Sequence, residues 1–322
     1  MDPNTIISNI KNIYNEILNR DPTQQEYRNT YFKIINRRLT QDQLRSQLNK
    51  SNEKKNLALH QKVQQRKEAI LSLPIIGSMT TIPKRLLEIK ETIDSIKNQT
   101  IKLTKLILAI PHKFQRTGEE YVIPPELLED PFIHIHRCND SGPITKLIGA
   151  LECISDPNTV FITFDDDIKY PPNAVQNLLT GYFVNENAVY CASGVNFHYL
   201  KDERGNISTN QIIFNEQEET GPTKILEGWG GVIYRRSFFK NEDIKFLIPT
   251  SKHCFLSDDL MISNYLAKHN IPIIKLKKHQ LHVRSTAHYN ALFTGADGLS
   301  FRTFPRYQLA VDELKRERRF FL

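Results

Sequence analysis

The sequence has few cysteines and no long apolar run. Four cysteines, Cys138, Cys153, Cys191 and Cys254, are widely spaced and form no Cys-x-x-Cys pair. This spacing argues against a disulfide framework and a zinc knuckle, and we expect the thiols to be reduced. No segment approaches the roughly 18 apolar residues of a membrane-spanning helix, and MDPNTIISNIKN lacks the basic start and apolar core of a signal peptide. We therefore expect a soluble, intracellular, cytoplasmic protein with no transmembrane segment.

Several signatures of nucleotide-binding and hydrolytic sites are also missing. The chain contains no G-x-x-x-x-G-K-[ST], G-x-S-x-G, G-x-G-x-x-G or H-E-x-x-H, so P-loop, α/β-hydrolase, dinucleotide and zincin chemistries lose support. Basic stretches at 54–67 and 313–319 have no interleaved aromatic residues on a recognisable module. A nucleic-acid partner is therefore not expected.

The composition is that of a folded protein with an excess of positive charge. Of 322 residues, 39% are hydrophobic and 25% charged, which is a globular rather than a disordered composition. The net charge of +7 favours anionic partners such as nucleotides or phosphosugars. Surface lysine that only aids solubility is the alternative explanation.

The first 68 residues contain no glycine, which favours helices. Apolar positions recur on one helical stripe, namely Ile6, Ile10, Ile13, Tyr14, Ile17 and Leu18. Asp21 before Pro22 is typical of a helix start, and Thr40 with Gln43 is typical of a capping box. The polar, basic run at 48–69 suits an exposed helix or a linker. We predict a helical N-terminal domain and linker over residues 1–69.

From residue 70 to 322 the pattern becomes short apolar strands that alternate with amphipathic helices. Strands are predicted at 73–79, 105–111, 132–137 and 160–164, and helices at 84–99 and 144–154. Shorter mixed strands are predicted at 188–194, 211–216, 223–228 and 231–236, followed by a helix at 257–269, a strand at 271–277 and a basic tail. Such β-α-β alternation predicts an α/β fold with a mixed, mainly parallel sheet flanked by helices. Ligands of these sheets bind outside the carboxyl ends of the strands.

Three consecutive carboxylates follow the predicted strand at 160–164, in VFITFDDDIKYPP. Adjacent like charges at about 4 Å repel by roughly 1 kcal/mol even in water. Because side chains alternate along a strand, Asp165 and Asp167 are expected to point the same way and Asp166 the other way. Carboxylate oxygens suit Mg²⁺ or Mn²⁺, so Asp165 and Asp167 are predicted metal ligands. A solvated loop with an Asx turn is the alternative.

A Gly-Pro turn precedes the predicted helix at 144–154. Gly142 and Pro143 lead into a helix start, whose free N–H groups favour anions. Lys146 lies in the first turn, where the helix dipole disfavours a cation. This placement predicts a phosphate contact for Lys146, whereas extension of the side chain into solvent is the alternative.

The single tryptophan, Trp229, lies among glycines in ILEGWGGVIYRR. Gly228, Gly230 and Gly231 would allow the backbone to approach a ligand closely, and an indole face suits the apolar side of a sugar ring. A tryptophan that only fills the core is the competing interpretation.

Two further acidic residues, Asp258 and Asp259, follow Ser257 at the start of the predicted helix at 257–269. A helix N-terminus with Ser257 as its N-cap would explain both carboxylates structurally. Next to a metal-type aspartate cluster, either could instead be the general base for a hydroxyl nucleophile. Of the histidines at 279, 282 and 288, we choose His282 as a candidate metal ligand, with a surface role as the alternative.

Together these residues resemble the GT-A type of nucleotide-sugar glycosyltransferase, near family 2. The resemblance spans roughly residues 73–285 and rests on the order of SMTTIPKRL with TIDSIKNQT, GPITK, TFDDDIKYPP, and EGWGG with SDDL. It implies that Thr80, Thr81 and Arg85 border the nucleotide, and that Asp165, Asp166 and Asp167 lie at a metal-bound diphosphate. It also implies that Trp229, Gly230 and Gly231 line the acceptor side and that Asp258 or Asp259 is the base. Many relatives carry Glu-Asp in place of the Asp-Asp pair.

The N-terminal stretch separately resembles a small helical domain of unknown function that is found fused to bacterial and giant-virus glycosyltransferases. The function that the resemblance implies is Mn²⁺- or Mg²⁺-dependent transfer of a sugar from a nucleotide-sugar, a UDP-sugar by preference, to a hydroxyl of a glycan or glycoprotein acceptor with inversion. Two alternatives stay open. One is a metal-dependent nucleotidyltransferase or phosphotransferase, and the other is a non-catalytic carbohydrate-binding or scaffold protein.

Overall fold

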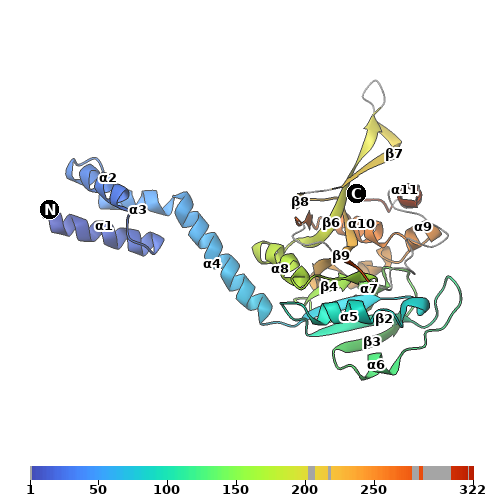
Figure 1. Cartoon of the computed structure of the whole chain (residues 1–322). Helices are drawn as coiled ribbons and strands as arrows, with labels where there is room; N and C mark the ends of the chain where they lie inside the picture. Colours follow the sequence, from blue (N-terminus) through green and yellow to red (C-terminus); the bar gives the residue numbers. More distant parts are fainter. Residues whose placement is uncertain (1, 202–206, 217–218, 278–282, 286–305, 318) are drawn as a thin grey trace. The chain divides into compact units, whose positions relative to one another are not determined.

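The computed structural model describes residues 2–201, 207–216, 219–277, 283–285, 306–317 and 319–322. The chain divides into two compact units, Met1–Ala69 and Ile70–Leu322. Figure 1 shows the order of their elements along the chain. No helix in the described part of the chain has both the length and the apolar character needed to cross a membrane.

The N-terminal unit is helical. Its helices are α1 (Pro3–Leu18), α2 (Gln24–Ile35), α3 (Gln41–Asn49) and α4 (Asn52–Leu71), the last of which runs just past the boundary. The predicted stripe of α1 is buried against Leu39 and Leu44, and each buried aliphatic side chain contributes roughly 1.5–3 kcal/mol. The capping box of Thr40 and Gln43 is confirmed at the start of α3. The start expected at Asp21 is wrong, because Thr23 forms its own capping box with Glu26.

The second unit is an α/β structure built on a mixed sheet. Its strands are β1 (Ile75–Thr80), β2 (Lys105–Pro111), β3 (Ile133–Cys138), β4 (Val160–Phe164), β6 (Val189–Lys201), β7 (Ile207–Glu216), β8 (Gly221–Pro222), β9 (Ile225–Arg235) and β10 (Ile273–Lys275). Within the described residues the order is β3-β2-β1-β4-β9-β6-β10-β8, with β7 paired to β6. The first four strands are parallel, and β9 runs antiparallel to both β4 and β6. The predicted α/β class with a mixed sheet is confirmed at this level.

Helices cover the sheet and lead chain segments to one edge. They are α5 (Lys90–Lys97), α6 (Pro125–Glu129), α7 (Thr145–Cys153), α8 (Ala174–Val184), α9 (Lys252–Phe255), α10 (Asp258–Lys268) and α11 (Arg306–Arg316). Helix α7 packs on β1 and β2, α8 packs on β6 and β9, and α10 packs on β9. A small second sheet pairs β5 (Ile168–Lys169) with β11 (Val283–Arg284).

Some predicted boundaries differ from the structure for local reasons. The helix predicted at 84–99 is divided into a 3-10 turn, Pro83–Arg85, and the shorter α5. The segments 223–228 and 231–236, expected as two strands, belong to the single strand β9. In β9, φ of Gly231 is +84°, a conformation that glycine adopts at no steric cost and that lets the strand continue through an irregular position.

The parallel block sets the location of the candidate site. Because β1 pairs in register with both β2 and β4, Thr80 lies beside Ala109, and Met79 lies beside Phe164. The segments that follow these strands therefore meet at one edge of the sheet. This is the edge at which ligands bind in open α/β sheets.

Candidate functional site

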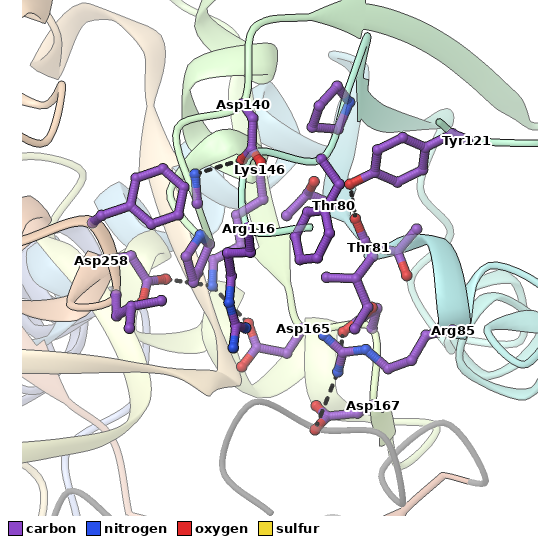
Figure 2. A pocket seen from close by; sticks show the side chains of 18 of the residues that line it. Thr80, Thr81, Arg85, Arg116, Tyr121, Asp140, Lys146, Asp165, Asp167 and Asp258 are labelled. Carbon is purple, nitrogen blue, oxygen red and sulfur yellow. Dashed lines mark hydrogen bonds and ion pairs between the residues drawn. The ribbon is translucent and has the colours of Figure 1, made fainter. Parts of the chain in front are cut away.

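A cavity lies at the carboxyl edge of the parallel strands (Figure 2). Segments that follow β1, β2, β3 and β4, together with the starts of α7 and α10, converge on it. Its described lining residues are Thr80, Thr81, Ile82, Arg85, Pro111, Phe114, Arg116, Tyr121, Asp140, Gly142, Pro143, Lys146, Asp165, Asp166, Asp167, Phe255, Leu256, Asp258 and Asp259. The fold thus brings together nine of the candidate site residues predicted from the sequence, together with Gly142 and Pro143.

The three consecutive aspartates form a turn and do not continue the strand. Strand β4 ends at Phe164, so the expected alternation of side chains, with Asp166 facing away from the other two, is wrong. All three line the cavity. Asp165 pairs with Lys146, whereas Asp166 and Asp167 both lie near Arg85, at N···O distances of 2.9 Å and 3.6 Å. The division therefore falls between the first carboxylate and the other two.

Arg85 is the buried counter-charge of the second and third aspartates. The 3-10 turn that begins at Pro83 carries Arg85 inward, where it is only 6% exposed. Burial raises the pKa of Asp166 to about 6, although the nearby Arg85 guanidinium lowers it. The Thr92 hydroxyl donates to the Asp166 carbonyl at 2.9 Å, and this bond anchors the turn on α5.

Lys146 is buried between two carboxylates that come from different parts of the chain. Its Nζ lies 2.6 Å from Asp165 Oδ1 and 2.7 Å from Asp258 Oδ2 (Figure 2). Burial alone would lower the pKa of the ammonium group, but Asp165, Asp258 and Asp259 outweigh that effect and hold the pKa well above its usual value. With 4% of the residue exposed, the side chain does not extend into solvent. Lys146 links the end of β4 to the start of α10.

Helix α10 supplies the second pair of carboxylates. It begins at Asp258, but the Ser257 side chain does not cap it, because the Ser257 hydroxyl donates to the His253 carbonyl at 2.7 Å. Asp259 Oδ1 accepts a hydrogen bond from the Gly228 N–H at 2.8 Å. Burial, followed by the adjacent Asp258 charge, raises the pKa of Asp259 well above its usual value.

At Gly228 several charged groups lie close to the backbone of β9. A Cβ atom at this position would lie 3.0 Å from Lys146 Nζ, 3.2 Å from Asp259 Oδ1 and 3.5 Å from Asp165 Oδ1. The first two distances are shorter than ordinary van der Waals contact. Gly228 therefore allows an ammonium group and two carboxylates to gather against the strand.

The neighbouring glycines pack against the interior of the sheet. Gly230 and Gly231 are buried, and neither they nor Trp229 are among the described lining residues. A Cβ atom at Gly230 would lie 2.7 Å from Ala192 Cβ, so close strand packing explains that glycine. The assignment of Trp229, Gly230 and Gly231 to an acceptor stays a prediction. His282, the candidate metal ligand, lies outside the described residues, as do His279 and His288.

Phe114, Tyr121 and Asp140 line the side of the cavity formed by the segments after β2 and β3, and none of them was predicted from the sequence. Phe114 and Tyr121 meet edge to face with ring centroids 6.4 Å apart, and the Tyr121 hydroxyl donates to the Thr81 carbonyl at 3.1 Å. Asp140 accepts hydrogen bonds from the backbone N–H groups of Gln115 and Gly142, each at 2.8 Å. Asp140 lies in an Asn-Asp-Ser-Gly-Pro turn, and this sequence predicts an aspartate side chain that accepts hydrogen bonds from nearby backbone N–H groups. Tyr121 has no comparable signal in the sequence.

The charge balance of the lining fits a hard cation. Six carboxyl groups line the cavity against the three cationic groups Arg85, Arg116 and Lys146, an excess of three formal negative charges. No group of three or more His, Cys, Asp or Glu side chains that could hold a metal ion is found in the described residues. Mg²⁺ does not need one, because it commonly binds through one or two carboxylates and completes its shell with water and phosphate oxygens. Asp165 and Asp167 supply the right donor chemistry.

Comparisons of the chain with protein-family models and with curated proteins find no match. The functional interpretation therefore depends on the residues and geometry of the cavity.

Proposed function

We propose that the chain is a metal-dependent glycosyltransferase that moves a sugar from a nucleotide-diphosphate sugar, preferably a UDP-sugar, to a hydroxyl of a glycan or glycoprotein acceptor. The observation that carries the proposal is the convergence, in one cavity at the carboxyl edge of the sheet, of the β4 aspartates with the Asp258–Asp259 pair at the start of α10. Lys146 joins the two carboxylate groups directly. The order of motifs that resembles GT-A enzymes gives this cavity its proposed chemistry.

The donor half of the proposed site is the region between β1, β2 and β4. The aromatic pair Phe114 and Tyr121 offers a wall for a nucleobase, and Thr80 and Thr81 border the nucleotide. Mn²⁺ or Mg²⁺, held by Asp167 and Asp165, would neutralise the diphosphate and stabilise it as a leaving group. An excess of lining carboxylates explains why a diphosphate would need such a cation to enter.

The acceptor half is the region around Gly228 and α10. Asp259, whose pKa is raised by burial and by Asp258, takes the proton from the attacking acceptor hydroxyl in this proposal. Asp258 has a different role, because its Oδ2 atom holds the Lys146 ammonium group. A single displacement with one such base inverts the anomeric configuration, so a retaining product would exclude this role for Asp259.

The test is ligand-dependent unfolding of the full chain. Trp229 is the sole tryptophan and lies in β9, so its fluorescence reports on the unit that contains the cavity. A diphosphate at about 100 times its dissociation constant stabilises the fold by about 2.7 kcal/mol. We expect UDP to raise the midpoint when Mn²⁺ is present and to have little effect without it, and a parallel titration with GDP tests the nucleotide preference. No metal-dependent shift with either diphosphate would overturn the donor assignment.

Two variants and a product assay sharpen this test. Asp167→Asn should lose the metal-dependent shift and the transferase activity while keeping the fold. Asp94→Asn, which removes a carboxylate from the exposed face of α5, should keep both. Release of UDP from a UDP-sugar supports the proposal, whereas release of pyrophosphate would support the nucleotidyltransferase alternative.

A further inference from the structure

Most of the excess of positive over negative charge lies in the N-terminal unit. Residues 1–69 contain 13 Lys and Arg residues against 7 Asp and Glu residues, which is +6 of the net +7. The second unit is close to neutral by the same count. Because the two units differ so much in net charge, an anionic partner is expected to bind the N-terminal unit.

Within this unit, one surface combines basic and apolar side chains. Helix α2 has one face in the helical core, through Tyr27, Tyr31 and Ile34. Its other face exposes Phe32 and Ile35, which are 60% and 47% exposed. Exposed apolar side chains that lie together on a protein surface often mark a site of contact with another protein or a membrane.

Four cations lie near these two apolar side chains along the chain. Arg28 lies one turn before Phe32 on the same helix face, Lys33 is the next residue after Phe32 and lies on a different face, and Arg37 and Arg38 follow the end of α2. All four are exposed, and none forms an ion pair with a carboxylate in the described residues. The sequence between Glu26 and Asp42 contains no acidic residue. We call Arg28, Phe32, Lys33, Ile35, Arg37 and Arg38 the α2 surface.

We propose that the α2 surface binds the anionic headgroup region of a lipid bilayer. A helix with aromatic and aliphatic side chains beside Lys and Arg is suited to the membrane interface, where the apolar side chains enter the acyl boundary and the cations meet lipid phosphates. A nucleic-acid backbone would satisfy the four cations but leave Phe32 and Ile35 exposed to water. The lipid surface accounts for both kinds of side chain.

This surface binds independently of the proposed transferase activity, since it belongs to the other compact unit. The test is cosedimentation of the full chain with vesicles of phosphatidylcholine alone or mixed with phosphatidylglycerol. We expect binding only to the mixed vesicles at about 0.1 M salt, where the Debye length is about 10 Å, and loss of binding at about 1 M, where it is about 3 Å. Equal binding to both kinds of vesicle, or to neither, would overturn the proposal.

Substitutions distinguish binding through the α2 surface from binding that depends only on the net charge of the protein. Each basic residue near an anionic membrane contributes about 1 kcal/mol, or about fivefold in affinity, so Arg28→Gln with Arg37→Gln and Arg38→Gln should weaken binding about 100-fold. The control removes the same charge from exposed positions of α4, as Lys55→Gln with Lys62→Gln and Lys67→Gln, and should weaken binding much less. Equal losses in the two triple variants would show that net charge alone drives binding.

The apolar part has its own test. Phe32→Ser with Ile35→Ser keeps every charge and should weaken vesicle binding at least tenfold, since both side chains would leave the acyl boundary. Both residues are exposed, so far-ultraviolet circular dichroism and the unfolding midpoint should not change. Unchanged vesicle binding in this double variant, or equally tight binding of wild-type protein to a single-stranded oligonucleotide with the same dependence on Arg28, would refute a lipid partner.

Discussion

Replacing Lys146 tests whether one buried cation holds the cavity together. In Lys146→Met a flexible side chain of similar length keeps the packing, but Asp165 and Asp258 lose the ammonium group that lies 2.6 Å and 2.7 Å from them. Removing one partner of a buried ion pair costs about 3–5 kcal/mol, since a buried charge is left uncompensated. The Asp165 side chain keeps 28% of its surface exposed, so we expect a loss at the lower end, about 3 kcal/mol.

The loss is measurable in the unit that contains the cavity. For a folded unit of about 150–250 residues, 1 kcal/mol shifts the unfolding midpoint by about 2–4 °C, so the variant should unfold about 6–12 °C below wild type. Trp229 fluorescence follows this transition. Without added metal, the midpoint should fall by this amount at neutral pH.

A second lysine provides the matched control. Lys97 pairs with Asp130, but its side chain is 35% exposed, and ion pairs of this kind contribute at most about 1 kcal/mol. Lys97→Met should therefore lower the midpoint by only a few degrees. If Lys146→Met unfolded no earlier than Lys97→Met, the role given to Lys146 as the link between β4 and α10 would be refuted.

Two further substitutions test the site and the N-terminal unit. Gly228→Ala places a Cβ atom 3.0 Å from Lys146 Nζ and should abolish the UDP- and Mn²⁺-dependent shift. Gly77→Ala, which meets only leucine side chains at 3.0 Å, should lower stability by about 1–3 kcal/mol but keep that shift, and the reverse pattern would contradict the Gly228 assignment. Hydrogen bonds from Arg20 lower the pKa of Glu26 from 4.5 to about 2, so its stabilisation is complete above pH 4.5 and is lost as the pH falls toward 2. Glu26→Gln should therefore lower the free energy of unfolding by about 1 kcal/mol at pH 7, after allowance for solvent screening, and by almost nothing near pH 2. Unfolding followed by circular dichroism at the two pH values measures this difference. A loss of stability that does not change with pH would exclude this ion pair as its source.

Elements with local signals were predictable from the amino-acid sequence. The strands at 105–111 and 160–164 match β2 and β4, because a short, continuous apolar run between polar segments is typical of a strand that is buried on both faces of a parallel sheet. The capping box of Thr40 and Gln43 was equally readable, since its partners are only three residues apart. The candidate aspartates at 165–167 and 258–259 were found in the same way, as carboxylates next to predicted element ends.

The pairing of these groups depends on the three-dimensional fold. Lys146 and Asp165 are 19 residues apart in sequence, and Asp258 is much farther along, yet the sheet order brings all three to one point. The alternation assumed for the aspartates failed because β4 ends at Phe164, and backbone beyond a strand end no longer follows its two-residue period. The exposure of Phe32 likewise depends on which face of α2 the other helices cover. The sequence gives the residue types directly, whereas the partners and the exposure of these residues depend on distant segments that no local pattern specifies.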